Sequence, residues 1–519
     1  MLFNSYTFIF FFLPIVLLVF YKLKHKTLSI YWLILSSFFF YAWWNTIYLM
    51  LLIGSIVFNY YLSKILHYYT HNNGRHCYQT FFMFFGIFSN LFLLGYFKYY
   101  NFFTNNINIV FDCKFRNHEI ILPLAISFYT FQQIAFLVDS CKEESTKCSF
   151  KYYCLFISFF PQLIAGPIMR YFETVPQYQK KNFFAFNYSN VSIGISIFII
   201  GLFKKIVLAD GIAPYATSVF NAANNGETIF FIESWCGSLS YTFQLYFDFS
   251  GYSDMAIGLG RMFNIIFPVN FYSPYCTTNI IDFWKQWHIT LSSFLRDYIY
   301  IPLGGNRKGN LKKYINIMLT MLIGGLWHGA GWTFIVWGGI HGIYICLNHL
   351  WRSSGITNNK YILKYISIYN FISFLITFLA LNIAWIFFRS ENILTAKEIM
   401  FGLLGINGIN LPPGYLNFFG SYSEMLLNYG ILFQSDILPS YINIIAWLVI
   451  LTCITWMGPN TYEIFQYYKP ALRLTFNKTF YHLPIRWTPS LLWGMIISCI
   501  FTICIILLSS ASEFLYFNF

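Results

Sequence analysis

The feature that most constrains this chain is a series of long segments without charged side chains. A bilayer-spanning helix needs about 20 apolar residues, and most of these segments reach or approach that length. They are 1–21, 27–63, 76–97, 120–138, 152–169, 182–203, 314–351, 365–388, 437–462 and 487–512, together with 228–247, in which Glu233 is the one charged residue. Only 10% of the 519 residues are charged, against roughly a quarter in soluble proteins. The sequence therefore predicts a membrane protein.

The segment lengths predict an all-α polytopic fold. A helix rises about 1.5 Å per residue, so 27–63 and 314–351 are each long enough for two crossings. The full set predicts about 11 to 13 membrane helices. Lys22, Lys24 and Lys26 follow the first segment instead of preceding it, which favours a retained anchor with the N-terminus outside over a cleaved signal peptide.

The net charge of +13 does not indicate a nucleic-acid partner. The basic residues lie in short loops between apolar segments, with the densest group at 296–313, as the positive-inside rule predicts for cytoplasmic loops. The 11 cysteines are scattered and form no CxxC pair. We therefore expect neither a disulfide framework nor a metal site.

The chain is predicted to form a single membrane domain over 1–519. Its Gly-, Pro- and Asn-rich stretch at 405–436 is expected to be a loop with short surface helices. Residues 241–313 alternate aromatic and charged side chains, and ionisable groups near a membrane tend to line a polar pathway. Within this stretch, 273–313 is predicted to contain an in-plane amphipathic helix at the cytoplasmic face, so function is sought there and in the apolar segment that follows.

Three histidines occur in the charge-free segment 314–351. His328 lies among small residues in GGLWHGAGW, where burial favours a neutral imidazole that can act as a general base. A purely structural histidine remains the alternative. His341 lies thirteen residues later and would point away from His328 on a continuous helix. For His341 and His349 we expect structural roles, whereas His288 is equally compatible with an interfacial and a catalytic role.

Other candidates carry less information. Asp248 and Asp254 are more consistent with salt bridges or helix caps than with an acid/base pair. The sequence contains no G-x-S-x-G, HExxH or GxxxxGK[ST] motif. A transporter or flippase without acyl chemistry is the alternative from another functional class, although we find no internal repeat of the kind common in secondary transporters.

The ordered motifs of this chain resemble the membrane-bound O-acyltransferase superfamily, in particular its bacterial alginate O-acetyltransferase branch. The resemblance is strongest over 1–350 and weaker over 351–519. Its main strings are LPLAISFYTFQQIAFLVD at 122–139, FFPQLIAGPIMR at 159–170, GLFKKIVLAD at 201–210, QLYFDFSGYSDMAIGLGRMF at 244–263, DFWKQWHITLSSFLRDYIYIPLGGNRKG at 282–309 and GGLWHGAGWTFIVWGGIHG at 324–342.

The resemblance implies a ring of helices around a central funnel or tunnel, with re-entrant segments. It assigns catalysis to His328 and His288, with His328 as the general base. Candidate substrate-binding residues are Trp327, Trp287, Asp282, Arg307 and Lys308, the last two as attractants for donor phosphates or as ordinary positive-inside charges.

The resemblance further implies transfer of a small acyl group, acetyl above all, to hydroxyls of an extracytoplasmic polysaccharide, alginate-like or cell-wall glycan. The donor would be acetyl-CoA or another thioester, used as a substrate, and no bound cofactor is expected. The expected partners are membrane lipid, an extracytoplasmic acyltransferase and the polysaccharide acceptor. The expected location is the bacterial inner membrane.

Overall fold

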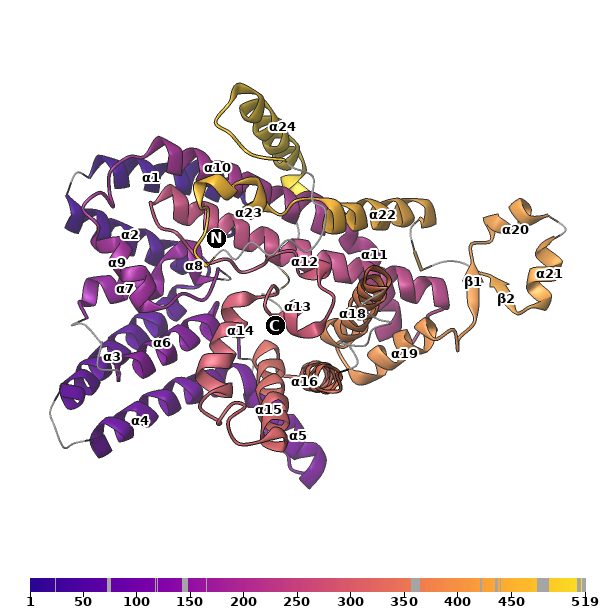
Figure 1. Ribbon diagram of the computed structural model, residues 1–519, viewed down its shortest axis with the longest axis horizontal. Coiled ribbons are helices and arrows are strands. Elements are labelled where there is room, and N and C mark those ends of the chain that lie inside the picture. Colours follow the sequence, from indigo (N-terminus) through magenta and orange to yellow (C-terminus); the bar gives the residue numbers. More distant parts are fainter. Residues whose placement is uncertain are drawn as a thin grey trace.

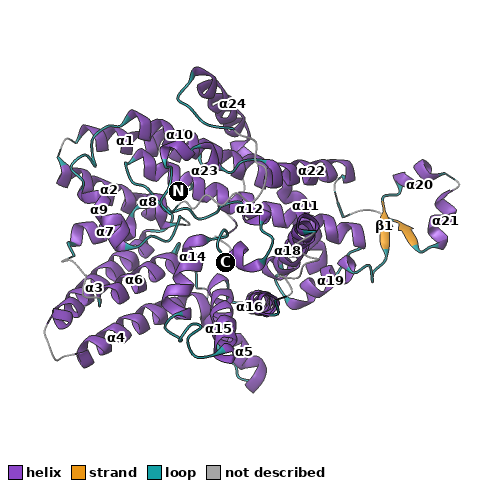
Figure 2. Ribbon diagram, in the orientation of Figure 1, coloured by secondary structure: helices purple, strands orange, loops and turns teal. Residues whose placement is uncertain are grey.

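A computed structural model describes residues 1–23, 25–71, 76–116, 118, 120–141, 148–164, 166–355, 365–420, 422–434, 437–438, 440–473, 485–510 and 515. The described part is almost entirely helical (Figure 2), with one pair of short strands that projects from the helical body. The predicted all-α polytopic fold is confirmed.

The N-terminal third forms a group of packed helices on one side of the body (Figure 1). The segment 27–63, which is long enough for two crossings, contains α2 and α3, and the chain breaks again between α7 and the short α8. The elements are η1 (Thr7–Phe12), α1 (Leu13–Lys22), α2 (Lys26–Ala42), α3 (Thr46–His71), α4 (His76–Leu94), η2 (Gly95–Tyr99), α5 (Tyr100–Phe111), α6 (Ile126–Ser140), α7 (Phe150–Ser158), α8 (Phe160–Leu163) and α9 (Tyr171–Gln179).

The central scaffold is a helix pair held at close range by glycines. It consists of α10 (Tyr188–Phe203), η3 (Lys204–Ala209), α11 (Asp210–Asn224) and α12 (Phe231–Met262). A Cβ on Gly201 would lie 2.6 Å from the Gly251 carbonyl oxygen, and one on Gly194 would lie 2.6 Å from that of Gly258. Only glycine permits such an approach. Residues 204–224, which include Lys204, Lys205 and Asp210, continue the α10 helix.

Short elements replace the single in-plane helix expected within 273–313. They are η4 (Pro274–Cys276), α13 (Ile280–Trp284), α14 (Ile289–Leu295) and η5 (Arg296–Tyr300). The segment 314–351 forms the predicted pair of helices, α15 (Asn310–His328) and α16 (Trp332–Ser353).

The C-terminal third adds helices around this centre and one excursion away from it (Figure 1). The predicted surface helices at 405–436 are present as α20 and α21, and the parallel pair β1–β2 was not predicted. The elements are α18 (Ile366–Arg389), α19 (Ile393–Leu403), β1 (Ile409–Leu411), α20 (Gly414–Phe419), α21 (Tyr422–Asn428), β2 (Ile431–Phe433), α22 (Tyr441–Met457), α23 (Thr461–Ile464), η7 (Gln466–Tyr468), α24 (Leu491–Leu507) and η8 (Leu508–Ser510).

Among the described residues, four helices are long and apolar enough to cross a membrane: 46–70, 76–111, 188–224 and 366–389. Shorter apolar helices lie at 7–22, 441–457 and 491–507. Many large apolar side chains on these helices are exposed, for example Phe88, Phe92 and Leu491, which suits contact with lipid. The protein is a multi-pass membrane protein, and the predicted number of 11 to 13 crossings remains a prediction.

Candidate active site

The turn between α15 and α16 places His328 at the end of a helix. α15 ends at His328, and the chain passes through Gly329, Ala330 and Gly331 before α16 begins at Trp332. A Cβ on Gly329 would lie 2.1 Å from the Phe334 ring, so this tight reversal requires glycine. His328 itself is only 4% exposed.

The two helices bring His341 back towards His328. Both histidine rings contact the Trp337 indole. The centroid of this indole lies 5.0 Å from that of the His328 ring and 4.7 Å from that of the His341 ring. The Phe388 ring of α18 is 5.2 Å from His328. The expectation that His341 points away assumed a continuous helix, and the reversal at 329–331 removes that assumption.

His288 is the third histidine at this centre. It is fully buried and lies in the break between α13 and α14, where its φ of 42° is unusual for a residue other than glycine. Its ring centroid is 6.2 Å from that of Trp327. The Trp327 ring in turn lies 4.9 Å from that of His328, and Lys98 Nζ lies 3.1 Å from the His328 carbonyl oxygen. Residues from three separate segments therefore meet around His328.

Asn270 determines which nitrogen of His288 carries the proton. Its Oδ1 accepts hydrogen bonds from the Thr290 backbone N–H at 3.3 Å and from the Thr290 hydroxyl at 2.9 Å, and lies 3.2 Å from His288 Nδ1. Because this oxygen is an acceptor, Nδ1 must donate to it. In a neutral ring, Nε2 of His288 then carries the lone pair.

A row of stacked aromatic rings connects the histidines to a polar network. Trp327 stacks on Phe131 at 5.1 Å, Phe131 on Phe294 at 4.2 Å, and Phe294 contacts Tyr298 at 4.8 Å. The row crosses from α15 through α6 and α14 to η5. These rings fill the region between Trp327, next to His328, and the polar network around Tyr298.

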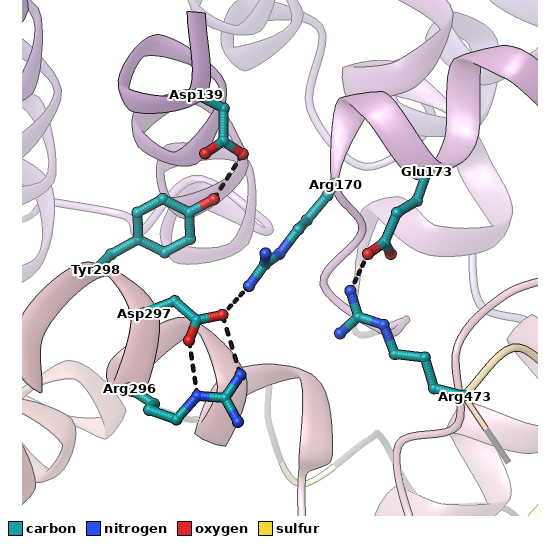
Figure 3. Close-up of polar contacts among 7 residues, drawn as sticks. All are labelled: Asp139, Arg170, Glu173, Arg296, Asp297, Tyr298 and Arg473. Atoms are coloured by element: carbon teal, nitrogen blue, oxygen red, sulfur yellow. Dashed lines mark hydrogen bonds and ion pairs between the residues drawn. The ribbon is translucent and has the colours of Figure 1, made fainter. Parts of the chain in front are cut away.

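That network joins three of the sequence motifs (Figure 3). The Tyr298 hydroxyl donates to Asp139 at 2.7 Å, and Asp297 accepts from Arg170 and, at 2.7 Å, from Arg296 Nε. Burial alone would raise the pKa of Asp297, but the hydrogen bonds from Arg296 and Arg170 outweigh it and hold this pKa below its ordinary value. In the same view Arg473 pairs with Glu173.

A groove of about 1050 Å³ lies between α16 and α18. Its lining includes Tyr344, whose ring is 6.1 Å from that of His341, and Arg352. Arg352 Nη2 donates to Asn279 at 2.9 Å and lies 3.5 Å from Asp282. The groove thus reaches from a charged edge towards the aromatic residues beside His328.

The remaining predicted site residues divide into two groups. Trp287 is buried and stacks on Phe283 at 5.6 Å, and the Phe283 ring lies 6.2 Å from that of His341. Asp282 is partly exposed and pairs with Lys285 at 2.8 Å. Arg307 and Lys308 are exposed just before α15, and the 19 residues of that helix separate them from His328 by about 28 Å.

Asn270 and Lys98 were missed by the sequence analysis. Asn270 falls outside any recognisable motif, and Lys98 follows an uncharged segment as a single lysine. An isolated lysine within an apolar helix was the available signal. As predicted, Asp248 and Asp254 form salt bridges, to Lys205 and Lys204 respectively, each at 2.6 Å.

Within the part of the chain that the structure describes, no three His, Cys, Asp or Glu side chains are grouped to hold a metal ion. None of the 11 cysteines, all of which lie in the described part of the chain, forms a disulfide bond.

Comparisons with known proteins identify the family of this chain. The membrane-bound O-acyltransferase (MBOAT) family matches residues 118–389. A peptidoglycan O-acetyltransferase of Helicobacter pylori is 40% identical over all of this chain and 98% of its own length. The probable alginate O-acetylase AlgI of Pseudomonas aeruginosa is 38% identical over 76% of this chain and 73% of its own.

A more distant relative is the teichoic acid D-alanyltransferase of Bacillus subtilis, 30% identical over 44% of this chain and 60% of its own length. The matched segment 118–389 contains the three histidines, the aromatic row and the network around Asp297 in Figure 3. The chain therefore belongs to the membrane-bound O-acyltransferase family and is an O-acyltransferase.

Proposed function

We propose that this protein transfers an acetyl group from a cytoplasmic thioester to hydroxyls of peptidoglycan on the far side of the bacterial inner membrane. The observation that carries the proposal is the meeting of His328 and His288 in one buried, aromatic-lined centre. The peptidoglycan acceptor is supported by a relative of that activity that matches the whole chain, whereas the alginate O-acetylase covers about three quarters of it.

In the proposed step, His328 is the general base. One of its ring nitrogens takes the proton of the acceptor hydroxyl while the hydroxyl oxygen attacks the thioester carbonyl carbon. The C–S bond breaks, and the departing thiolate recovers the proton from the imidazolium. General base catalysis contributes about 10²–10⁴-fold. His288, oriented by Asn270, contacts the thioester or assists this proton transfer.

The distribution of basic residues supports the proposed direction of transfer. The loop before α15 carries Arg307 and Lys308 and the first turn of α15 carries Lys312 and Lys313, whereas residues 390–436 contain one lysine and four acidic residues. The positive-inside rule therefore assigns the start of α15 to the cytoplasm. Acetyl-CoA would enter from that side, and an extracytoplasmic acyltransferase would receive the acetyl group or present the glycan.

The test uses the purified chain in liposomes with acetyl-labelled acetyl-CoA and two acceptors, soluble peptidoglycan fragments and alginate oligosaccharides. Label that appears in peptidoglycan fragments and not in alginate is the expected result. Label found only in the alginate oligosaccharides would contradict peptidoglycan as the acceptor and identify alginate in its place. No thioester consumption above that of protein-free liposomes, with either acceptor and with a periplasmic extract added, would overturn the proposal of an acetyl-CoA donor.

A further inference from the structure

The carbonyl groups at the end of α15 are bound by side chains from another helix. The last carbonyls of a helix have no partner within it, and here Lys98 Nζ donates to Trp327 O at 2.6 Å and lies 3.1 Å from His328 O. The Tyr99 hydroxyl donates to Leu326 O at 2.6 Å. Three successive carbonyls, the last that of His328, are therefore bound by two neighbouring residues.

The same helix also holds the other side of the turn. Asn106 Oδ1 accepts a hydrogen bond from Trp332 Nε1 at 2.9 Å, and the Phe102 ring is 5.9 Å from that of Trp332. Asn106 lies seven residues after Tyr99, which is two helical turns and hence the same face. One face of the helix 76–111 therefore contacts the turn between α15 and α16 both before and after Gly329–Gly331.

The local geometry of that helix changes where it passes His328. Residues Gly95–Tyr99 form a π-turn between α4 and α5, and such turns are rare within helices and frequent at functional sites. The half-buried Lys98 also lies over the Trp327 ring, 5.9 Å from its centroid. A lysine within an apolar helix is costly and is retained where it pairs with backbone carbonyls or serves a site. A cation at a helix C-terminus is also favourable.

We propose that Lys98 and Tyr99 are positioning residues of the acyl transfer, and that the helix 76–111 serves as a clamp that fixes the backbone of His328. The inference rests on the proposed role of His328. Lys98 acts through His328 and not on the substrate. Because His328 is the last residue of its helix and is followed by two glycines within three residues, its ring position depends on contacts supplied from outside α15.

The test compares Lys98→Met, Lys98→Arg and Tyr99→Phe with two matched controls in the same liposome assay with acetyl-CoA. Lys64→Met removes a lysine on α3 that lies over the Tyr60 ring, as Lys98 lies over Trp327. Tyr96→Phe removes an exposed hydroxyl three residues before Tyr99. Lys98→Met is expected to lower kcat by about 10²-fold, the cost of a displacement near 1 Å. KM for acetyl-CoA should stay unchanged, and Lys98→Arg should recover most of the loss.

A second readout does not require turnover. Diethylpyrocarbonate modifies accessible imidazoles, and mass spectrometry of the peptide that contains His328 gives its rate of modification. Lys98→Met and Tyr99→Phe are expected to raise this rate several-fold, whereas Lys64→Met and Tyr96→Phe leave it unchanged. Tyr99→Phe removes a single oxygen and therefore tests the clamp even if Lys98→Met does not fold.

The outcomes separate the two proposals. Full turnover in His328→Ala would overturn the proposed function. Loss of turnover in His328→Ala, with wild-type kcat and wild-type modification rates in Lys98→Met and Tyr99→Phe, would overturn the clamp alone. Equal losses in Lys98→Met and Lys64→Met would also overturn it, since they would reflect a general effect of removing a lysine.

Discussion

The scaffold formed by α10 and α12 and the site around His328 both bury polar side chains between helices. The groups that contact these side chains differ between the two regions. Lys205 lies 2.6 Å from Asp248 and 2.9 Å from Asp210, so its charge is matched by carboxylates. The His328 ring instead contacts Trp327, Trp337 and Phe388. In both regions, polar groups are packed between apolar helices.

This difference suggests that the buried charges of the scaffold stabilise the fold, whereas the buried histidine serves the proposed reaction. In the scaffold, Asp254 accepts from Lys204, from Thr461 at 2.6 Å and from Tyr462 at 2.8 Å, which links helices distant in sequence. The role of such a carboxylate is to hold these helices together. At the site, the aromatic rings surround His328, which in the proposed function accepts and returns a proton. Substitutions in the two regions should therefore affect different measurements.

The largest expected effect is that of His328→Ala. Loss of the general base should lower acyl-transfer turnover by about 10²–10⁴-fold, while the thermal midpoint in detergent stays close to that of the wild type. Turnover is measured with labelled acetyl-CoA, and folding by size-exclusion chromatography and the thermal midpoint. Normal turnover in His328→Ala would contradict the proposed difference between the two regions. A loss of turnover that is fully explained by unfolding would contradict it too.

Asp248→Ala should produce the opposite pattern. Removal of one partner of a buried ion pair costs about 3–5 kcal/mol, so the yield of folded protein and its thermal midpoint should fall while turnover per folded molecule is retained. Asp282→Ala is the matched control, because Asp282 pairs with Lys285 at the surface and exposed pairs contribute about 0–1 kcal/mol. Equal destabilisation by both variants would contradict the assignment of Asp248 to the scaffold.

The smallest effect is expected from Asp297→Asn in the network of Figure 3. Because the folded-state pKa of Asp297 is lowered, its ionised form stabilises the protein above its unfolded pKa, and this contribution is lost as the pH falls through the folded pKa. The variant should melt below the wild type at pH 7, and the difference should narrow as the pH drops below about 4. A difference that does not change with pH would exclude this charge-dependent contribution.

Membrane insertion, helical class and the central histidine could be predicted from sequence because each depends on local composition. Uncharged segments of sufficient length predict membrane crossings, and the small residues around His328 mark a place of close approach. The continuation of α10 to Asn224 could not be predicted, because the sequence alone does not show the partners of Lys204 and Lys205. Lys205 pairs with Asp210 on the same helix, and Lys204 and Lys205 pair with Asp254 and Asp248 on α12.

The sequence by itself determined that the chain is a polytopic helical membrane protein of a recognisable family and that His328 stands out in it, because hydrophobicity and ordered motifs are properties of the chain alone. Only the tertiary structure decided that His341 lies beside His328, that Asn270 orients His288, and that Lys98 and Tyr99 hold the end of α15. These relations join residues separated by up to some 230 positions. They depend on helix packing and on the reversal at Gly329–Gly331, which local pattern does not encode.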